Sequence, residues 1–124
     1  MTQYISLEQV KKAAREAYDN GTLGALNFSE CMNIYPDSNS RCAVAACFND
    51  ETIKKIKLAQ QETASFTSLI NNETLSCLTA EKSKIHDIQH AHDKWATTID
   101  TNKKQDARKK FLKLIDYKTP VLVP

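Results

Sequence analysis

Apolar residues recur every three or four positions near the start of the chain, and this period predicts an amphipathic helix over residues 7–20. Ser6 and Gln9 have the spacing of a capping box at the N-terminus of this helix. Gly21 can adopt the left-handed conformation that ends a helix at low cost. The apolar stripe of the helix consists of Leu7, Val10, Ala14, Ala17 and Tyr18.

The middle of the chain carries a weaker pattern. Three alanines in the apolar run at positions 42–48 favour a short buried helix over residues 41–48. Asn49 and Asp50 supply a break and a cap for a second helix that begins at Glu51. Between these segments and the first helix, a short β-hairpin near residues 25–35 would fit the alternating apolar residues. The inner face of the second helix is expected to hold Ile53, Ile56, Ala59 and Ala64.

The last third of the chain predicts two longer helices, over residues 80–99 and residues 102–116. Thr79 can cap the first of them. Its apolar seam has the three-and-four spacing of a helix face buried against another helix, either inside the chain or across a homodimer. The apolar tail at residues 121–124 is expected to fold back over the core. The seam comprises Ile85, Ile88, His92, Trp95 and Ile99, and the inner face of the last helix comprises Ala107, Phe111, Leu114 and Ile115.

These elements predict a mostly α fold, a compact single-domain bundle of about five helices over residues 1–124, with the hairpin near residues 25–35 as an optional addition. The 124 residues include only two glycines and three prolines. That scarcity excludes glycine-rich phosphate loops and disfavours a β-sandwich with many turns. No apolar run approaches the roughly 20 residues that span a membrane, and the first residues lack a signal-peptide pattern. We therefore expect a cytoplasmic protein without membrane association.

The net charge of +2 is unevenly distributed. Residues 101–118 hold seven basic and two acidic side chains, whereas the first hundred residues hold ten basic and thirteen acidic ones. A basic segment of this kind favours a protein partner with an acidic surface. Nucleic acid is the alternative partner, because phosphates also attract cations, although no nucleic-acid-reading motif accompanies the charge. The contact residues predicted here are Lys103, Lys104, Arg108, Lys109, Lys110 and Lys113.

Three histidines gather in one predicted helix. His86, His90 and Asp93 fall within a narrow arc of that helix, away from its apolar seam. Two histidines four positions apart can share a metal ion with a carboxylate, but no distant ligand accompanies them, so we predict an exposed contact surface without metal or other cofactor. His92 belongs to the seam itself, which favours a structural histidine that bonds to Asp93, Gln89 or a backbone carbonyl.

The cysteines offer an alternative chemistry. Cys31, Cys42, Cys47 and Cys77 contain no C-x-x-C pair, so neither a zinc ribbon nor a thioredoxin motif is predicted. Cys42 near a helix start could have its thiolate favoured by the helix dipole and meet His90 or His92 as a base. The main prediction assigns no catalytic residue, and this cysteine-dependent enzyme is the alternative.

Two segments resemble an uncharacterised family of small proteins from phages, prophages and bacteria. The first is R-C-A-V-A at positions 41–45 with N-D-E at positions 49–51, and the second is I-Q-H-A-H-D at positions 88–93 followed by Trp95. The family pattern reads C-A-[IV]-G, then D-E, then L-Q-x-x-H-D, with Ala45 and Ile88 here in place of the glycine and the leucine. The resemblance implies an accessory protein, phage-encoded, that binds and blocks a component of the host or of its defence, and it implies no catalytic role.

Overall fold

The computed structural model describes residues 2–23 and 42–118. Within these residues the chain is mostly helical, as predicted. The predicted hairpin near residues 25–35 and the predicted fold of the tail at residues 121–124 lie outside the described residues. The elements are β1 (Gln3–Tyr4), α1 (Leu7–Asn20), the 3-10 turn η1 (Ala45–Cys47), α2 (Asp50–Leu58), α3 (Phe66–Asn71), β2 (Leu75–Ser76), α4 (Thr79–Thr97) and α5 (Thr101–Leu114).

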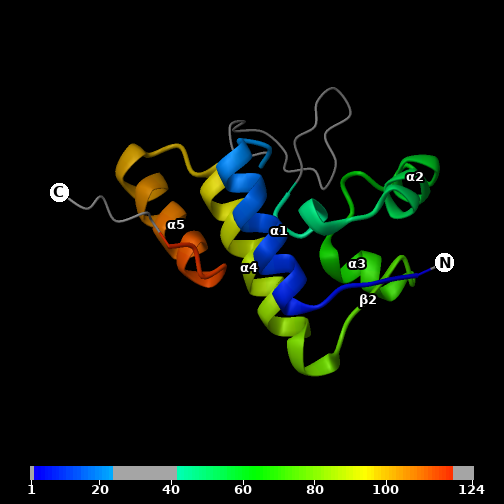
Figure 1. Ribbon diagram of the computed structural model, residues 1–124. Helices are drawn as coiled ribbons and strands as arrows, with labels where there is room; N and C mark the ends of the chain where they lie inside the picture. Colours follow the sequence, from blue (N-terminus) through cyan, green and yellow to red (C-terminus); the bar gives the residue numbers. More distant parts are fainter. Residues whose placement is uncertain (1, 24–41, 119–124) are drawn as a thin grey trace.

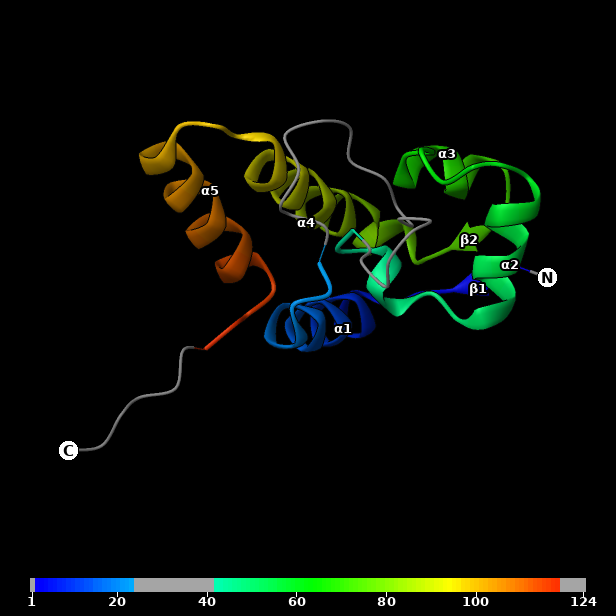
Figure 2. The same ribbon diagram turned by 90° about the horizontal axis from the view of Figure 1, so that it is seen from above.

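Helix α4 is the central element of the fold. Figure 1 shows α1 and α4 side by side in the centre, with α5 on one flank and α2, α3 and β2 on the other. The view from above in Figure 2 gives the same order. The most extensive packing joins α4 to α5, and α4 also contacts α1 and α3. Helix α4 therefore contributes side chains to surfaces on both flanks of the molecule.

The capping box and the glycine end predicted for the first helix are both confirmed. Ser6 Oγ accepts a hydrogen bond from the backbone N–H of Gln9 at 3.1 Å, and Gln9 Oε1 accepts one from the backbone N–H of Ser6 at 2.9 Å. This reciprocal capping box satisfies two N–H groups that have no partner inside the helix. Gly21 ends the helix with a positive φ of 69°.

The short strands were not predicted. β1 and β2 form a parallel pair in which Gln3 is aligned with Leu75. Two-residue strands are too short to show an alternating pattern, so only the tertiary structure defines them. The Gln3 side chain extends the connection, because its Nε2 donates to Cys47 O at 3.0 Å and its Oε1 accepts from Asn49 N at 3.0 Å. The N-terminal segment thereby holds the junction between η1 and α2.

The middle of the chain departs from its prediction in two ways. Residues 42–48, which belong to the predicted helix over residues 41–48, form a buried turn followed by the 3-10 turn η1. Asn49 caps α2 by accepting from Thr52 N at 2.8 Å, so the helix begins at Asp50, one residue before the predicted start at Glu51. However, α2 stops at Leu58, and Gln60 takes a positive φ of 55°. Ala59, predicted to face inward, is therefore exposed.

The α4 seam is buried against the chain's own helices. Ile85, Ile88 and His92 are fully or almost fully buried. The ring of His92 meets that of Phe111 from α5 at a centroid distance of 5.6 Å. Ile99 is 73% exposed, contrary to prediction, because α4 ends at Thr97.

The start of α4 also differs from its prediction. Thr79 is the first residue of the helix and not its cap, and Leu78 occupies the cap position without a side-chain hydrogen bond. Glu81 lies in the first turn, where a carboxylate interacts favourably with the helix dipole. Its Oε1 accepts from the backbone N–H of Leu7 at 3.0 Å, which joins the starts of α4 and α1. In the described part of the chain, no helix has the length and apolar content that would cross a membrane.

Candidate functional site

Two hollows beside α4 contain five of the residues predicted for the two contact surfaces: His86, His90 and Asp93 line one, and Lys110 and Lys113 line the other. The first, the histidine pocket, is a cavity of about 180 Å³. Its lining is Cys42, Val44, Phe48, Thr63, Ala64, Ser65, Phe66, Leu69, His86, Gln89, His90 and Asp93. The second, the lysine groove, has a volume of about 720 Å³. Its lining is Leu7, Lys11, Lys84, Asp87, Ile88, Lys110, Lys113, Leu114 and Asp116.

Helical spacing separates the two hollows. His86, His90 and Asp93 follow one another at intervals of four and three, so they share one face of α4. Lys84 and Ile88 are also four positions apart but occupy a different face. The predicted histidine and aspartate arc is thus brought together by the structure, as expected, and it lines a cavity. It does not join the basic residues of α5 in a continuous surface, because α4 lies between them.

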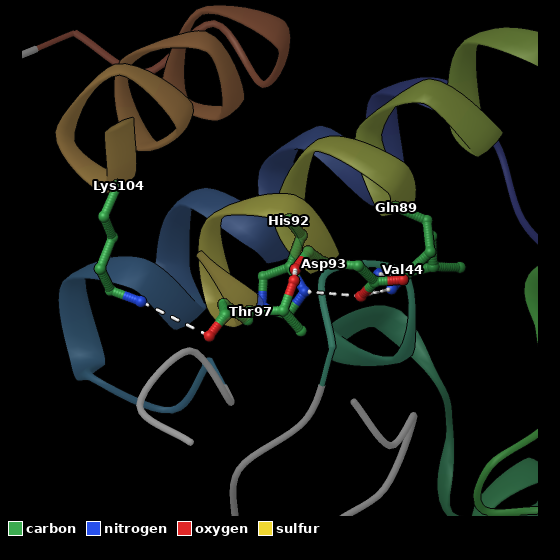
Figure 3. A network of polar contacts seen from close by, with 7 residues as sticks. Val44, Gln89, His92, Asp93, Thr97 and Lys104 are labelled. Carbon is green, nitrogen blue, oxygen red and sulfur yellow. Dashed lines mark hydrogen bonds and ion pairs between the residues drawn. The ribbon is translucent and has the colours of Figure 1, made fainter. Parts of the chain in front are cut away.

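A chain of hydrogen bonds holds the wall of the histidine pocket. The backbone N–H of Val44 donates to Gln89 Oε1 at 3.1 Å, and Gln89 Nε2 donates to Asp93 Oδ1 at 2.7 Å. His92 Nδ1 lies 3.3 Å from the same oxygen, so Asp93 supplies the hydrogen bond that was predicted for this buried ring. Figure 3 shows these side chains along one edge of α4, facing the turn that contains Val44. The two segments that carry the family resemblance therefore meet at this pocket.

The Cys42 thiol lines the pocket in its neutral form. Cys42 is only 5% exposed, and burial raises the pKa of its thiol to about 12. The Asp93 carboxylate also raises the pKa, whereas hydrogen bonding with the Ala45 and Val44 backbone and with the Gln89 side chain lowers it. The raised pKa disfavours the alternative in which a helix start stabilises the Cys42 thiolate, because loss of hydration outweighs the backbone donors.

The proposed thiol and base are only partly brought together. Cys42 and His90 line the same pocket, but His92 is buried on the seam and is not part of the lining. The rings of His86 and His90 are exposed and stack almost in parallel, with centroids 6.4 Å apart. Among residues 2–23 and 42–118, no three His, Cys, Asp or Glu side chains are grouped so as to hold a metal ion.

The lysine groove gathers charge from three helices. Lys11 comes from α1, Lys84 from α4, and Lys110 and Lys113 from α5. Lys11 Nζ is 2.9 Å from Asp116 Oδ2, and this contact lowers the pKa of the Asp116 carboxyl. Lys11 and Lys84 were not predicted as contact residues, because nothing in local spacing connects them to the basic segment at residues 101–118.

The floor of the groove is apolar. Leu7, Ile88 and Leu114 line it, one from each of the three helices. Leu114 was predicted to face inward, but it is 40% exposed. Its neighbours Phe111 and Ile115 occupy the buried face instead. Leu114 therefore belongs to the edge between the core and the groove, where it can contact a bound partner.

Two of the predicted contact residues have structural roles. Lys104 Nζ donates to the backbone oxygen of Trp95 at 2.8 Å, near the C-terminus of α4. A cation at this position interacts favourably with the carbonyl groups that end the helix. Arg108 Nη1 donates to the Tyr18 hydroxyl at 3.3 Å. Lys103 and Lys109 are exposed but do not line the groove, so the predicted basic surface contributes only Lys110 and Lys113 to it.

Comparison of the chain with protein-family models, with curated proteins and with solved structures gave no match. The resemblance of the segments at positions 41–51 and 88–95 therefore stays a prediction. The function of the two hollows is inferred from their geometry and chemistry.

Proposed function

We propose that this protein is a small, non-enzymatic binding protein that docks a protein partner with an acidic surface in the lysine groove. The observation that carries this proposal is the assembly of four lysines from three helices around an apolar floor. Charge complementarity at such a rim accelerates and orients association, while burial of apolar side chains provides most of the affinity.

The composition of the groove favours a protein partner over nucleic acid. Leu7 and Leu114 offer apolar surface that phosphate groups cannot cover favourably. Asp87 and Asp116 interrupt the basic rim and would repel a continuous line of phosphates. An acidic protein segment with apolar side chains complements both the floor and the lysines.

The biological role that fits this binding is inhibition of a host or anti-phage defence component in the host cytoplasm, by a phage-encoded accessory protein. The family resemblance supports this role, because it implies an accessory protein that binds and blocks a component of the host or of its defence. The neutral thiol of Cys42 is in keeping with a protein that acts by binding and not by thiol catalysis. Inhibition would then follow from covering part of the partner's surface.

The test is a comparative capture from a bacterial lysate with three forms of the protein. The groove variant is Lys110→Glu/Lys113→Glu. The matched control is Lys103→Glu/Lys109→Glu, which makes the same charge change on the same helix outside the groove. We expect the wild type and the control to retain one acidic protein that the groove variant loses. The affinity of the groove variant for that protein should be about a tenth of the wild-type affinity or less.

Two results would contradict the proposal. If the groove variant and the control lose the partner equally, the positive charge of α5 as a whole, and not the groove, controls binding. Recovery that disappears after nuclease treatment, with affinity that falls steeply with salt, would favour the nucleic-acid alternative. If a partner is recovered, the inhibitor role predicts that its activity falls when one equivalent of the protein is added.

A further inference from the structure

The histidine pocket has the features of a second, independent site. From its lining we infer that it binds a small organic amine, with the ammonium group at Asp93 and an apolar body over Phe48, Phe66 and Leu69. This inference does not depend on the lysine groove, which lies on another face of α4.

The size of the cavity limits the ligand. Its volume of about 180 Å³ corresponds to about six water molecules at their share of liquid volume. Drug-sized ligands occupy cavities of roughly 300 Å³ or more. The pocket therefore suits a compound of one ring or one short branched chain, with a single polar group.

The charge of the lining selects a cation. Among the described residues that line the pocket, Asp93 is the only Asp, Glu, Lys or Arg side chain, so this lining has one permanent negative charge. Its side chain is 40% exposed, and Gln89 Nε2 orients one of its oxygens at 2.7 Å. A carboxylate has further lone pairs to accept from a ligand, and a charge-assisted hydrogen bond to an ammonium is stronger than a neutral one.

The rest of the lining suits the other end of such a ligand. Phe48, Phe66 and Leu69 are buried apolar side chains. The stacked rings of His86 and His90 flank the same cavity. A ligand with a carboxylate would face Asp93 with no lysine or arginine among the described lining residues to compensate. An alcohol could donate to the Asp93 carboxylate but would bring no positive charge of its own. Figure 3 shows Asp93 and Gln89 beside each other on the edge of α4 that this ligand would contact.

The experiment titrates 2-phenylethylamine into the full chain and follows the ring protons of His86 and His90 by NMR. 2-Phenylethanol and 3-phenylpropionate serve as probes of similar shape with neutral and negative groups. We expect the amine to shift both histidines and to bind at least about tenfold more tightly than the alcohol, with no measurable binding of the acid.

Two variants test whether amine binding depends on the charge of Asp93. Asp93→Asn keeps an oxygen that can accept from Gln89 but removes the charge, and it should weaken amine binding about tenfold or more. Asp87→Asn removes the same charge from the same helix outside the pocket and should leave the affinity within a factor of about two. Thermal unfolding checks that both variants fold.

Three outcomes would overturn the inference. The first is that the amine leaves both histidines unshifted at millimolar concentration. The second is that it binds no better than the alcohol, and the third is that it binds equally well to the wild type and to Asp93→Asn. The comparison of the three probes uses the wild type alone, so it decides the matter even if a variant fails to fold.

Discussion

The histidine pocket and the lysine groove share α4 as a wall, yet they are built in opposite ways. In the wall of the pocket, the Val44 backbone N–H donates to Gln89, Gln89 donates to Asp93, and the buried His92 ring contacts Asp93 from behind the lining. In the groove, the lysines come from three helices, and Lys11 is ion-paired with Asp116. Short, mutually bonded side chains favour selection of one small ligand, whereas long charged ones favour attraction of a large partner.

The difference also shows how one helix can serve two purposes. The face of α4 with His86, His90 and Asp93 closes a small cavity, and the face with Lys84 and Ile88 borders a wide groove. The seam between these faces is buried and holds both in place. Changes that act on only one flank should therefore separate the two hollows experimentally.

The largest expected effect concerns the Cys42 thiol of the histidine pocket. With a pKa raised from 9.0 to about 12, its thiolate fraction at pH 8 is about a thousandfold lower than that of an unperturbed thiol. Iodoacetamide labelling followed by mass spectrometry should modify Cys42 far more slowly in native protein than in urea. Equal rates would restore the hypothesis of a reactive thiol paired with His90.

The same raised pKa has a consequence for stability. Above pH 9.0 the unfolded thiol ionises while the folded one stays protonated, so the free energy of unfolding should fall as the pH rises from 9 towards 12. Below pH 9 this contribution is constant. Urea unfolding of the wild type and of Cys42→Ala should show the steeper alkaline decline in the wild type.

The next largest effect is expected on the groove side of α4. Phe111 is fully buried and stacks on Trp95 with ring centroids 5.6 Å apart. Phe111→Ala should lower the free energy of unfolding by about 3–5 kcal/mol, measured by urea unfolding. Phe111→Ala should lower the affinity for the partner bound in the groove more than the affinity for the amine bound in the pocket. Equal losses at both sites would mean that the two hollows are not independent.

The reciprocal change acts on the pocket side. Gln89→Leu removes the acceptor for Val44 N–H and the donor to Asp93, at a cost of about 1–3 kcal/mol. Amine binding should weaken, and capture of the groove partner should be unchanged. A loss of partner binding without a loss of amine binding would reverse the assignment of the two hollows.

The smallest effect concerns the end of α4 on its α5 flank. Lys104→Met removes the ammonium that donates to Trp95 O and should cost about 1 kcal/mol by thermal or urea unfolding. Lys109→Met, on the same helix and exposed, is the matched control and should be almost neutral. Equal stability of the two variants would show that Lys104 is a surface charge like its neighbour.

Sequence periodicity predicted much of the helical framework. Capping by Ser6 and Gln9, the end of α1 at Gly21, the cap at Asn49 and the buried residues Ile85 and Phe111 all agree with the structure. These features depend on residues close together along the chain. The pairing of Gln3 with Leu75 could not be predicted in the same way, because it joins segments more than seventy positions apart.

The sequence alone determined which side chains share a helix face, and so it placed His86, His90 and Asp93 together. Only the tertiary structure decided which groups these side chains contact. Gln89 accepts from the Val44 backbone, Lys11 pairs with Asp116, and Lys104 donates to the end of α4. The physical reason is the range of the interactions. Helical period is set by local backbone geometry, whereas burial, pKa and charge complementarity depend on neighbours that only folding brings near.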